Sequence, residues 1–185
     1  FLADSAYTCI GENGNDTKGI QSCSGLTKIV LPSSMRHIGV RAFFYCGKLE
    51  NVVFNDGLKY IGTRAFQGTA LGESELPDSI EHIEEGAFMS VRNFGISKIP
   101  FGMTEICPNV FSNCQNMNIT SFGYTVGQEF SALDNNITVI GHGAFNNAGG
   151  NNIIEDVYLQ DSITILGENS FNVYGGYNEI MVHDD

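Results

Sequence analysis

Two adjoining stretches decide the fold, Leu26-Thr-Lys-Ile-Val-Leu-Pro32 and Ile38-Gly-Val-Arg-Ala-Phe-Phe-Tyr-Cys-Gly-Lys-Leu49. The phenylalanine at position 43 returns in an equivalent context along the chain, at steps of 23, 22, 23, 34 and 26 residues. The equivalent phenylalanines are Phe43, Phe66, Phe88, Phe111, Phe145 and Phe171. A repeat of this length indicates a stack of similar coils, because one coil alone cannot bury its apolar side chains.

Each repeat carries two further apolar signals. Five residues before each phenylalanine there is an aliphatic residue, and these are Ile38, Ile61, Ile83, Ile106, Ile140 and Leu166. An apolar triplet with the spacing i, i+3, i+5 also recurs, from Leu26/Ile29/Leu31 to Tyr177/Ile180/Val182. The last two positions of the triplet alternate with outward positions at period two, which is typical of a short strand with one face inward.

Stacking such coils about 4.8 Å apart would pair their strands in parallel and bring equivalent residues into columns. We therefore expect a β-rich solenoid of about seven coils with short irregular or helical turns. We expect the stack to be curved and right-handed, with one parallel concave sheet formed by the triplets. No helical periodicity extends over ten or more residues, as a helix bundle or an α/β enzyme would require.

The quoted motifs resemble the BspA-type leucine-rich repeat. The pattern is Leu-x-x-Ile-x-Leu-Pro followed by Ile-Gly-x-x-Ala-Phe-x-x-Cys-x-x-Leu. The resemblance implies a leucine-rich repeat solenoid in a bacterial protein that is secreted or exposed at the cell surface and is engaged in adhesion or other protein contacts. We expect residues 1–25 to form an N-terminal partial repeat or cap and residues 26–185 to form the repeat array. Residues 123–133 are an insertion in the fifth repeat, which we expect to be ordered.

The resemblance also accounts for three of the five cysteines, because Cys23, Cys46 and Cys114 each occupy the position three residues after the phenylalanine position. Cys23 and Cys46 would lie in adjacent coils, within disulfide reach. A stacking column requires bulk and not a covalent bond, so we expect free thiols.

The charge of the chain excludes some functions. With 9 basic and 21 acidic residues the chain has a net charge of −12. This negative charge would repel the phosphates of nucleic acid, so the chain is not expected to be a general nucleic-acid binder. No apolar run approaches the roughly 18 residues of a membrane span. The chain begins at Phe1 without a signal-peptide pattern, so we interpret it as a processed or excised piece. Residues 26–64 have a net charge of +4 and residues 65–91 a net charge of −6, an asymmetry that could steer a partner or simply belong to a solvated face.

The sequence offers no catalytic or cofactor-binding motif. His37 and His82 share a column, but Tyr60 separates them, so they would lie about 10 Å apart and could not hold one metal ion unaided. We therefore expect no enzymatic activity, no cofactor and no metal.

Two functions remain open. The first is an interaction module whose concave sheet binds a protein, such as a host-surface or matrix protein, or a glycan. The second is a structural spacer with no ligand of its own. Apolar residues at outward strand positions favour the interaction module, although such residues also stabilise strands. The candidate contact residues are Val30, Val53, Ile96, Lys98, Ile119, Tyr158 and Met181. The ends of the stack could also associate edge to edge with another copy.

Overall fold

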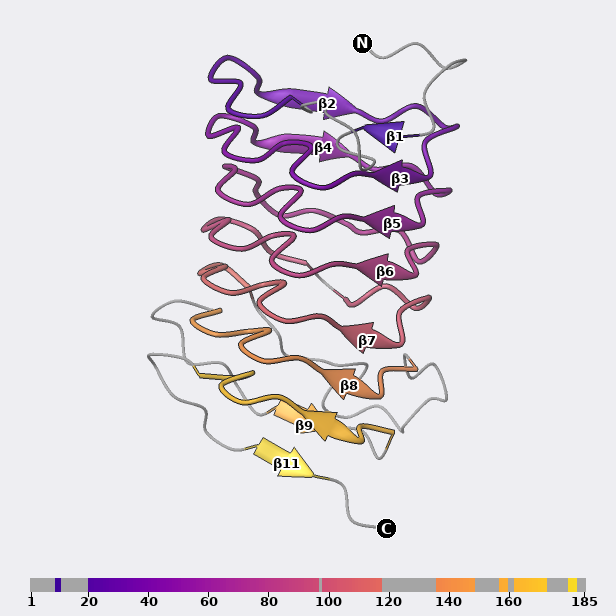
Figure 1. Ribbon diagram of the computed structural model, residues 1–185, viewed down its shortest axis with the longest axis vertical. Coiled ribbons are helices and arrows are strands. Elements are labelled where there is room, and N and C mark those ends of the chain that lie inside the picture. The colour runs from indigo at the N-terminus through magenta and orange to yellow at the C-terminus, as the bar shows by residue number, and fades with distance from the viewer. Residues whose placement is uncertain are drawn as a thin grey trace.

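The computed structural model describes residues 20–96, 98–117, 136–148 and 162–172, together with three short strands outside these ranges. Those strands are β1 (Cys9–Ile10), β9 (Val157–Leu159) and β11 (Ile180–Val182). The chain winds into a stack of short coils that runs from β1 at one end to β11 at the other (Figure 1). The stacked parallel strands confirm the expected leucine-rich repeat solenoid. The expected insertion at 123–133 lies outside the described residues.

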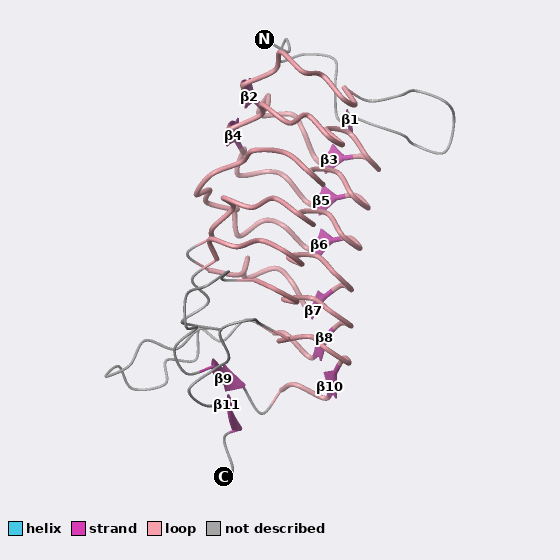
Figure 2. Ribbon diagram, turned by 90° about the vertical axis from the view of Figure 1, so that its left-hand side faces the viewer, coloured by secondary structure: helices cyan, strands magenta, loops and turns pink. Residues whose placement is uncertain are grey.

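The strands form ladders on two opposite faces of the stack (Figure 2). One face carries the aliphatic residues that precede each phenylalanine, and we call it the isoleucine face. Its strands are β1, β3 (His37–Ile38), β5 (Tyr60–Ile61), β6 (His82–Ile83), β7 (Glu105–Ile106), β8 (Val139–Ile140) and β10 (Ile165–Leu166). They pair in parallel in the order β1-β3-β5-β6 and again in the order β10-β8-β7.

The opposite face carries the apolar triplets, and we call it the triplet face. Here β2 (Lys28–Val30) pairs in parallel with β4 (Asn51–Val53), and β9 pairs in parallel with β11. The sequence predicted a single sheet on this face, whereas the longest ladder lies on the isoleucine face. The difference arises because a coil can supply two strands, one to each face. The strand on the isoleucine face is only two residues long, which is too short to give a periodic signal in the sequence.

Between the two ladders the chain turns around each phenylalanine. The residues two before and two after it have positive φ, as at Arg41 (53°) and Tyr45 (53°) in the first complete turn. The Phe43 N–H donates to the Ala65 carbonyl of the next coil at 2.8 Å, while the Phe44 N–H donates to the Arg41 carbonyl within the turn at 3.2 Å. Alternate backbone groups therefore bond along the stack and within the coil, which satisfies them without a helix. The described residues form no helix that could cross a membrane.

The repeated phenylalanines form the expected buried column. Their ring centroids lie 5.1 to 5.9 Å apart from one coil to the next, with nearly parallel planes. All six side chains are buried, as are the isoleucines at 38, 61, 83, 106 and 140. The two columns together fill the interior of the stack.

The cysteine column also lies inside the stack. The Cys46 thiol donates to the Ile20 carbonyl at 2.7 Å, and the Cys114 thiol donates to the Phe88 carbonyl at 3.1 Å. Burial raises the pKa of both thiols. Cys23, Cys46, Cys107 and Cys114 are free thiols, as the sequence predicted.

Candidate functional site

The predicted contact residues occupy different environments. Val30 and Val53 are neighbours in register on β2 and β4, and they are 53% and 44% exposed. Lys98 is exposed and forms an ion pair, whereas Ile96 is half-buried and packs against the core. Of the three other predicted contact residues, Tyr158 pairs in register with Met181 between β9 and β11. The side chains of these two residues and the whole of Ile119 lie outside the described residues.

A one-residue slip accounts for the position of Ile96. Equal spacing of the repeats predicts that Glu73 and Ile96 share a column, yet Glu73 forms a parallel bridge with Gly95. The Ser74 N–H donates to the Gly95 carbonyl at 2.9 Å, which fixes this register. A slip of one residue turns alternate side chains toward the other face of a sheet. Ile96 therefore contributes to packing as well as to the surface.

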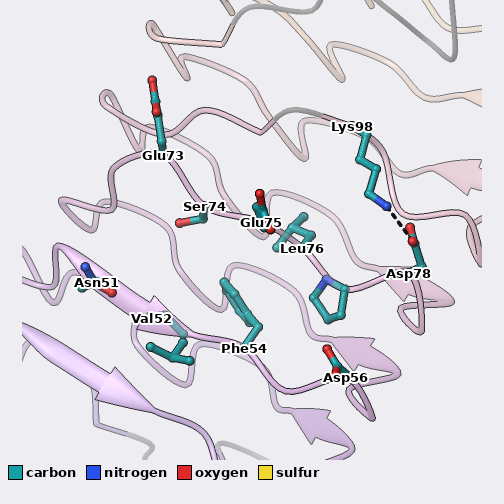
Figure 3. Close-up of a pocket in the computed structure, with 12 residues that line it drawn as sticks. Asn51, Val52, Phe54, Asp56, Glu73, Ser74, Glu75, Leu76, Asp78 and Lys98 are labelled. Carbon is teal, nitrogen blue, oxygen red and sulfur yellow. Dashed lines mark hydrogen bonds and ion pairs between the residues drawn. The ribbon is translucent and has the colours of Figure 1, made fainter.

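A groove opens on the triplet face just beyond β4 (Figure 3), with a volume of about 470 Å³. Among the described residues, no backbone hydrogen bond joins 52–54 to 74–76, so the ladder that joins β2 to β4 is interrupted here. We call this feature the acidic groove. Its lining residues are Asn51, Val52, Val53, Phe54, Asp56, Glu73, Ser74, Glu75, Leu76, Pro77, Asp78 and Lys98.

The groove follows from a break in the apolar pattern. Ser74 occupies the triplet position that Ile29 and Val52 hold in the preceding coils, and its small side chain is half-buried where theirs are buried. Phe54 lies edge-on against the Phe66 ring, with centroids 5.9 Å apart. Leu76, beside them, is buried in the core. The groove therefore lies where one inward side chain is shorter than its equivalents, and its lining is largely polar.

Carboxylates dominate the electrostatics of the groove. Asp78 forms an ion pair with Lys98, whose Nζ lies 2.5 Å from Oδ2. The hydrogen bond from Lys98, with a further one from the Phe101 N–H, lowers the pKa of the Asp78 carboxyl below its ordinary value. The other ion pair among the described residues, Lys59 with Glu81, lies on the isoleucine face.

Three carboxylates of the groove thus have no ion-pair partner within the described part of the chain. They are Asp56, Glu73 and Glu75, and each of these residues is exposed. With Asp78 and Lys98 included, the lining has four negative charges and one positive charge. Sequence reasoning singled out Val53 and Lys98 as outward strand residues but did not single out these acids. The signal for most of them is the acidic stretch 65–91, which contains Glu73, Glu75 and Asp78.

Ring side chains line up on the isoleucine face. His37, Tyr60 and His82 form a column in which the Tyr60 ring lies 5.7 Å from His37 and 6.4 Å from His82, so the two histidines are separated as predicted. The described residues contain no group of three or more metal-binding side chains. Burial raises the pKa of Tyr60 to about 12, with a contribution from hydrogen bonding to Glu84.

Cys107 lies on the same face beside acidic side chains. Its thiol lies 3.7 Å from Oε1 of Glu105. Burial, followed by the negative charges of Glu105 and Glu84, raises the pKa of Cys107 to about 12. The thiol is therefore protonated at neutral pH, which makes it a poor nucleophile.

Solved structures that are similar to this chain include two leucine-rich repeat proteins and a vaccine antigen. A leucine-rich repeat protein from Bacteroides ovatus is 24% identical over 80% of this chain and 46% of its own, with a TM-score of 0.48. The T. pallidum leucine-rich repeat protein is 23% identical over 60% and 67%, with a TM-score of 0.41. Pneumococcal vaccine antigen PcpA is 14% identical over 86% and 51%, with a TM-score of 0.44. The chain thus spans less than half the length of the first of these.

No curated protein matches the chain. The model of the BspA type leucine rich repeat region matches residues 17–129 and 120–184, in six copies. These matches cover most of the chain and coincide with the stacked coils of the structure. The chain belongs to the BspA-type leucine-rich repeat family.

Proposed function

We propose that this chain is a non-enzymatic protein-binding module of a secreted or cell-surface bacterial protein, and that it contacts its partner through the triplet face. The observation that carries the proposal is the exposed pair Val30 and Val53, which lie side by side in register on β2 and β4. Val53 also lines the acidic groove, so the apolar pair continues into a recess. Adjoining apolar and recessed surface is typical of contact sites in proteins.

A spacer without a ligand is the second candidate. The exposed polar side chains of Lys28, Asn51 and Glu73 on the same face favour it, because a spacer needs only a solvated surface. The two functions differ in what they require of Val30. In a spacer, replacing Val30 by a polar residue changes no binding. In a binding module, the same replacement removes apolar contact area.

The experiment measures binding of purified host-surface and matrix proteins, and of a glycan array, to the immobilised chain. The test variant is Val30→Asp. The matched control is Tyr45→Asp, which adds the same charge at a position 55% exposed in the turn after Phe43. We expect Val30→Asp to weaken capture of a protein partner and Tyr45→Asp to leave it unchanged. Equal capture by both folded variants would count against the triplet face, and capture of glycans alone would replace the protein partner by a carbohydrate.

Edge-to-edge self-association is part of the same proposal. The last described strand of the isoleucine face, β10, leaves Ile165 and Leu166 56% and 49% exposed, although Leu166 continues a column that is otherwise buried. An open strand edge with exposed apolar residues can pair with a second copy. Sedimentation of the same samples at increasing concentration separates binding by a monomer from binding by such an assembly.

A further inference from the structure

Two cysteines occupy equivalent positions in adjoining coils at the start of the stack. The Ser22 N–H donates to the Phe44 carbonyl at 2.8 Å, which sets the register of the two turns and places Cys23 in the same column as Cys46. Equivalent residues of stacked coils lie about 4.8 Å apart, and a disulfide spans Cα atoms about 4.4–6.8 Å apart. The column continues through Thr69, Val91, Cys114, Ala148 and Tyr174. Two cysteines therefore follow one another in this column only at its first step.

The thiol of Cys46 is directed at the turn that contains Cys23. It donates to the Ile20 carbonyl of that turn at 2.7 Å, and it is also hydrogen-bonded to the backbone of Cys23 itself. Cys46 is buried, whereas Cys23 is half-buried and packs against the core. The Cys46 sulfur thus already contacts the residue to which a bridge would lead, and Cys23 is the more accessible of the two thiols.

Cys114 shows the same arrangement without a cysteine beside it. Its thiol donates to the Phe88 carbonyl at 3.1 Å and is hydrogen-bonded to the backbone of Val91, which holds the position equivalent to Cys23. The direction of the thiol is therefore a property of the column, in which a cysteine side chain faces the equivalent residue of the preceding coil. What distinguishes Cys46 is that this equivalent residue is a second cysteine.

We propose that Cys23 and Cys46, free thiols in this structure, form a reversible disulfide that fastens the first coil to the second when the chain meets a small-molecule disulfide as oxidant. The thiolate of Cys23, the more accessible residue, attacks one sulfur of the oxidant and releases the first thiol. The thiolate of Cys46 then attacks the Cys23 sulfur of the mixed disulfide and releases the second thiol. The cysteines lose two electrons and two protons, and the oxidant is reduced to two thiols.

The bond would join the coil that carries β2 to the coil that carries β4. Each cysteine precedes the strand of its own coil by five residues, so a bridge between them holds the two strands in the register that the structure shows. Closing residues 23–46 into a loop also restricts the unfolded chain, and we expect the midpoint of thermal unfolding to rise by about 5–10 °C. Disulfides persist in secreted and surface proteins, which is the location proposed above, but the chemistry itself does not depend on that location.

The test oxidises the folded, fully reduced chain in mixtures of oxidised and reduced glutathione, alkylates the remaining thiols and digests the product with trypsin. Trypsin separates the two cysteines, because Cys23 falls in peptide 19–28 and Cys46 in peptide 42–48. We expect mass spectrometry to find these two peptides linked as the main product. We expect the bond to be about a hundredfold more favourable in the folded chain than in urea, because the fold holds the two thiols together.

Two matched variants each remove one thiol from the same column. Cys23→Ala should abolish the linked peptides and make the unfolding midpoint independent of the oxidant. Cys114→Ala, which removes the thiol that faces Val91, should leave both the linked peptides and the rise in midpoint unchanged. Cys46→Ser is the second test variant, since a hydroxyl can keep the hydrogen bond to the Ile20 carbonyl, and we expect the same losses as for Cys23→Ala.

Three outcomes would overturn the inference. They are the absence of linked peptides 19–28 and 42–48 from the oxidised folded chain, a main product that joins Cys23 or Cys46 to Cys9, and an oxidised chain that unfolds at the same midpoint as the reduced chain. None of these measurements uses a binding partner. The disulfide and the proposed binding function therefore stand or fall separately.

Discussion

Replacing Phe88 by alanine is the most direct test of how the stack is held together. Its ring is fully buried and lies against three others. The centroid of the Phe94 ring is 4.4 Å away with planes 9° apart, that of Phe66 is 5.3 Å away and that of Phe111 is 5.9 Å away. Truncation therefore removes a side chain that connects three consecutive coils.

The expected loss follows from these contacts. A buried Phe→Ala substitution costs about 3–5 kcal/mol of unfolding free energy, because apolar burial is lost and a cavity remains. Each aromatic pair adds about 0.5–1.5 kcal/mol beyond its buried area, which places Phe88→Ala near the upper end at about 5 kcal/mol. For a chain of this length, 1 kcal/mol corresponds to about 2–4 °C in the midpoint of thermal unfolding. We expect the midpoint to fall by about 10–20 °C.

The assay is thermal and urea unfolding followed by circular dichroism, with Phe101→Ala as the matched control. Phe101 is 45% exposed, and its backbone N–H keeps its hydrogen bond to Asp78 in the variant. We expect the control to change stability by about 0.5 kcal/mol or less. If Phe88→Ala shifts the midpoint no further than Phe101→Ala does, the stacked phenylalanine column is not what stabilises the chain.

Two further predictions concern the backbone and a thiol. Gly62→Ala should destabilise the chain more than Gly86→Ala, because a Cβ at 62 would lie 2.7 Å from the Val40 backbone nitrogen, whereas Gly86 has space and only a φ of +62°. Urea midpoints test the order, with about 1–2 kcal/mol expected for Gly86→Ala, and a reversed order would contradict it. Cys107, whose pKa is about 12, should react slowly with iodoacetamide at pH 8 in the folded chain. Because only the thiolate reacts, the rate of Cys107 alkylation should rise about tenfold per pH unit while the fold persists. A rate in the folded chain equal to that in the urea-unfolded chain would refute the raised pKa.

The buried columns could be predicted from the sequence because every coil places the same kind of residue at the same depth. Phe43 and Ile38, with their equivalents, are therefore visible as a repeat and are buried in the structure. The isoleucine-face ladder could not be predicted, since strands of two residues leave no alternation to detect. The positive φ of Arg41 was equally hidden, because glycine is the residue that normally marks this conformation.

The candidate site was predictable only in part. Alternation along the strands correctly placed Val30, Val53 and Lys98 on the surface of the triplet face. The register slip at Glu73 depends on where the chain passes between coils, which the residue pattern does not encode. Ser74 was visible in the sequence at an inward triplet position, but the interruption of the ladder beside it was not.

The groove and the aromatic core next to it are linked by how the repeat is varied. Ser74 stands where a β-branched apolar residue would close the triplet face, so this coil forgoes apolar burial there. One repeat further along, Phe94 occupies the triplet position that Leu26, Leu49 and Leu71 hold, and it stacks on Phe88 within the central column. The larger ring adds buried apolar area and aromatic contact one repeat after Ser74 reduces it. A shorter inward side chain in one coil is thus followed by a larger aromatic side chain in the next, so the array can vary one coil and keep apolar burial overall.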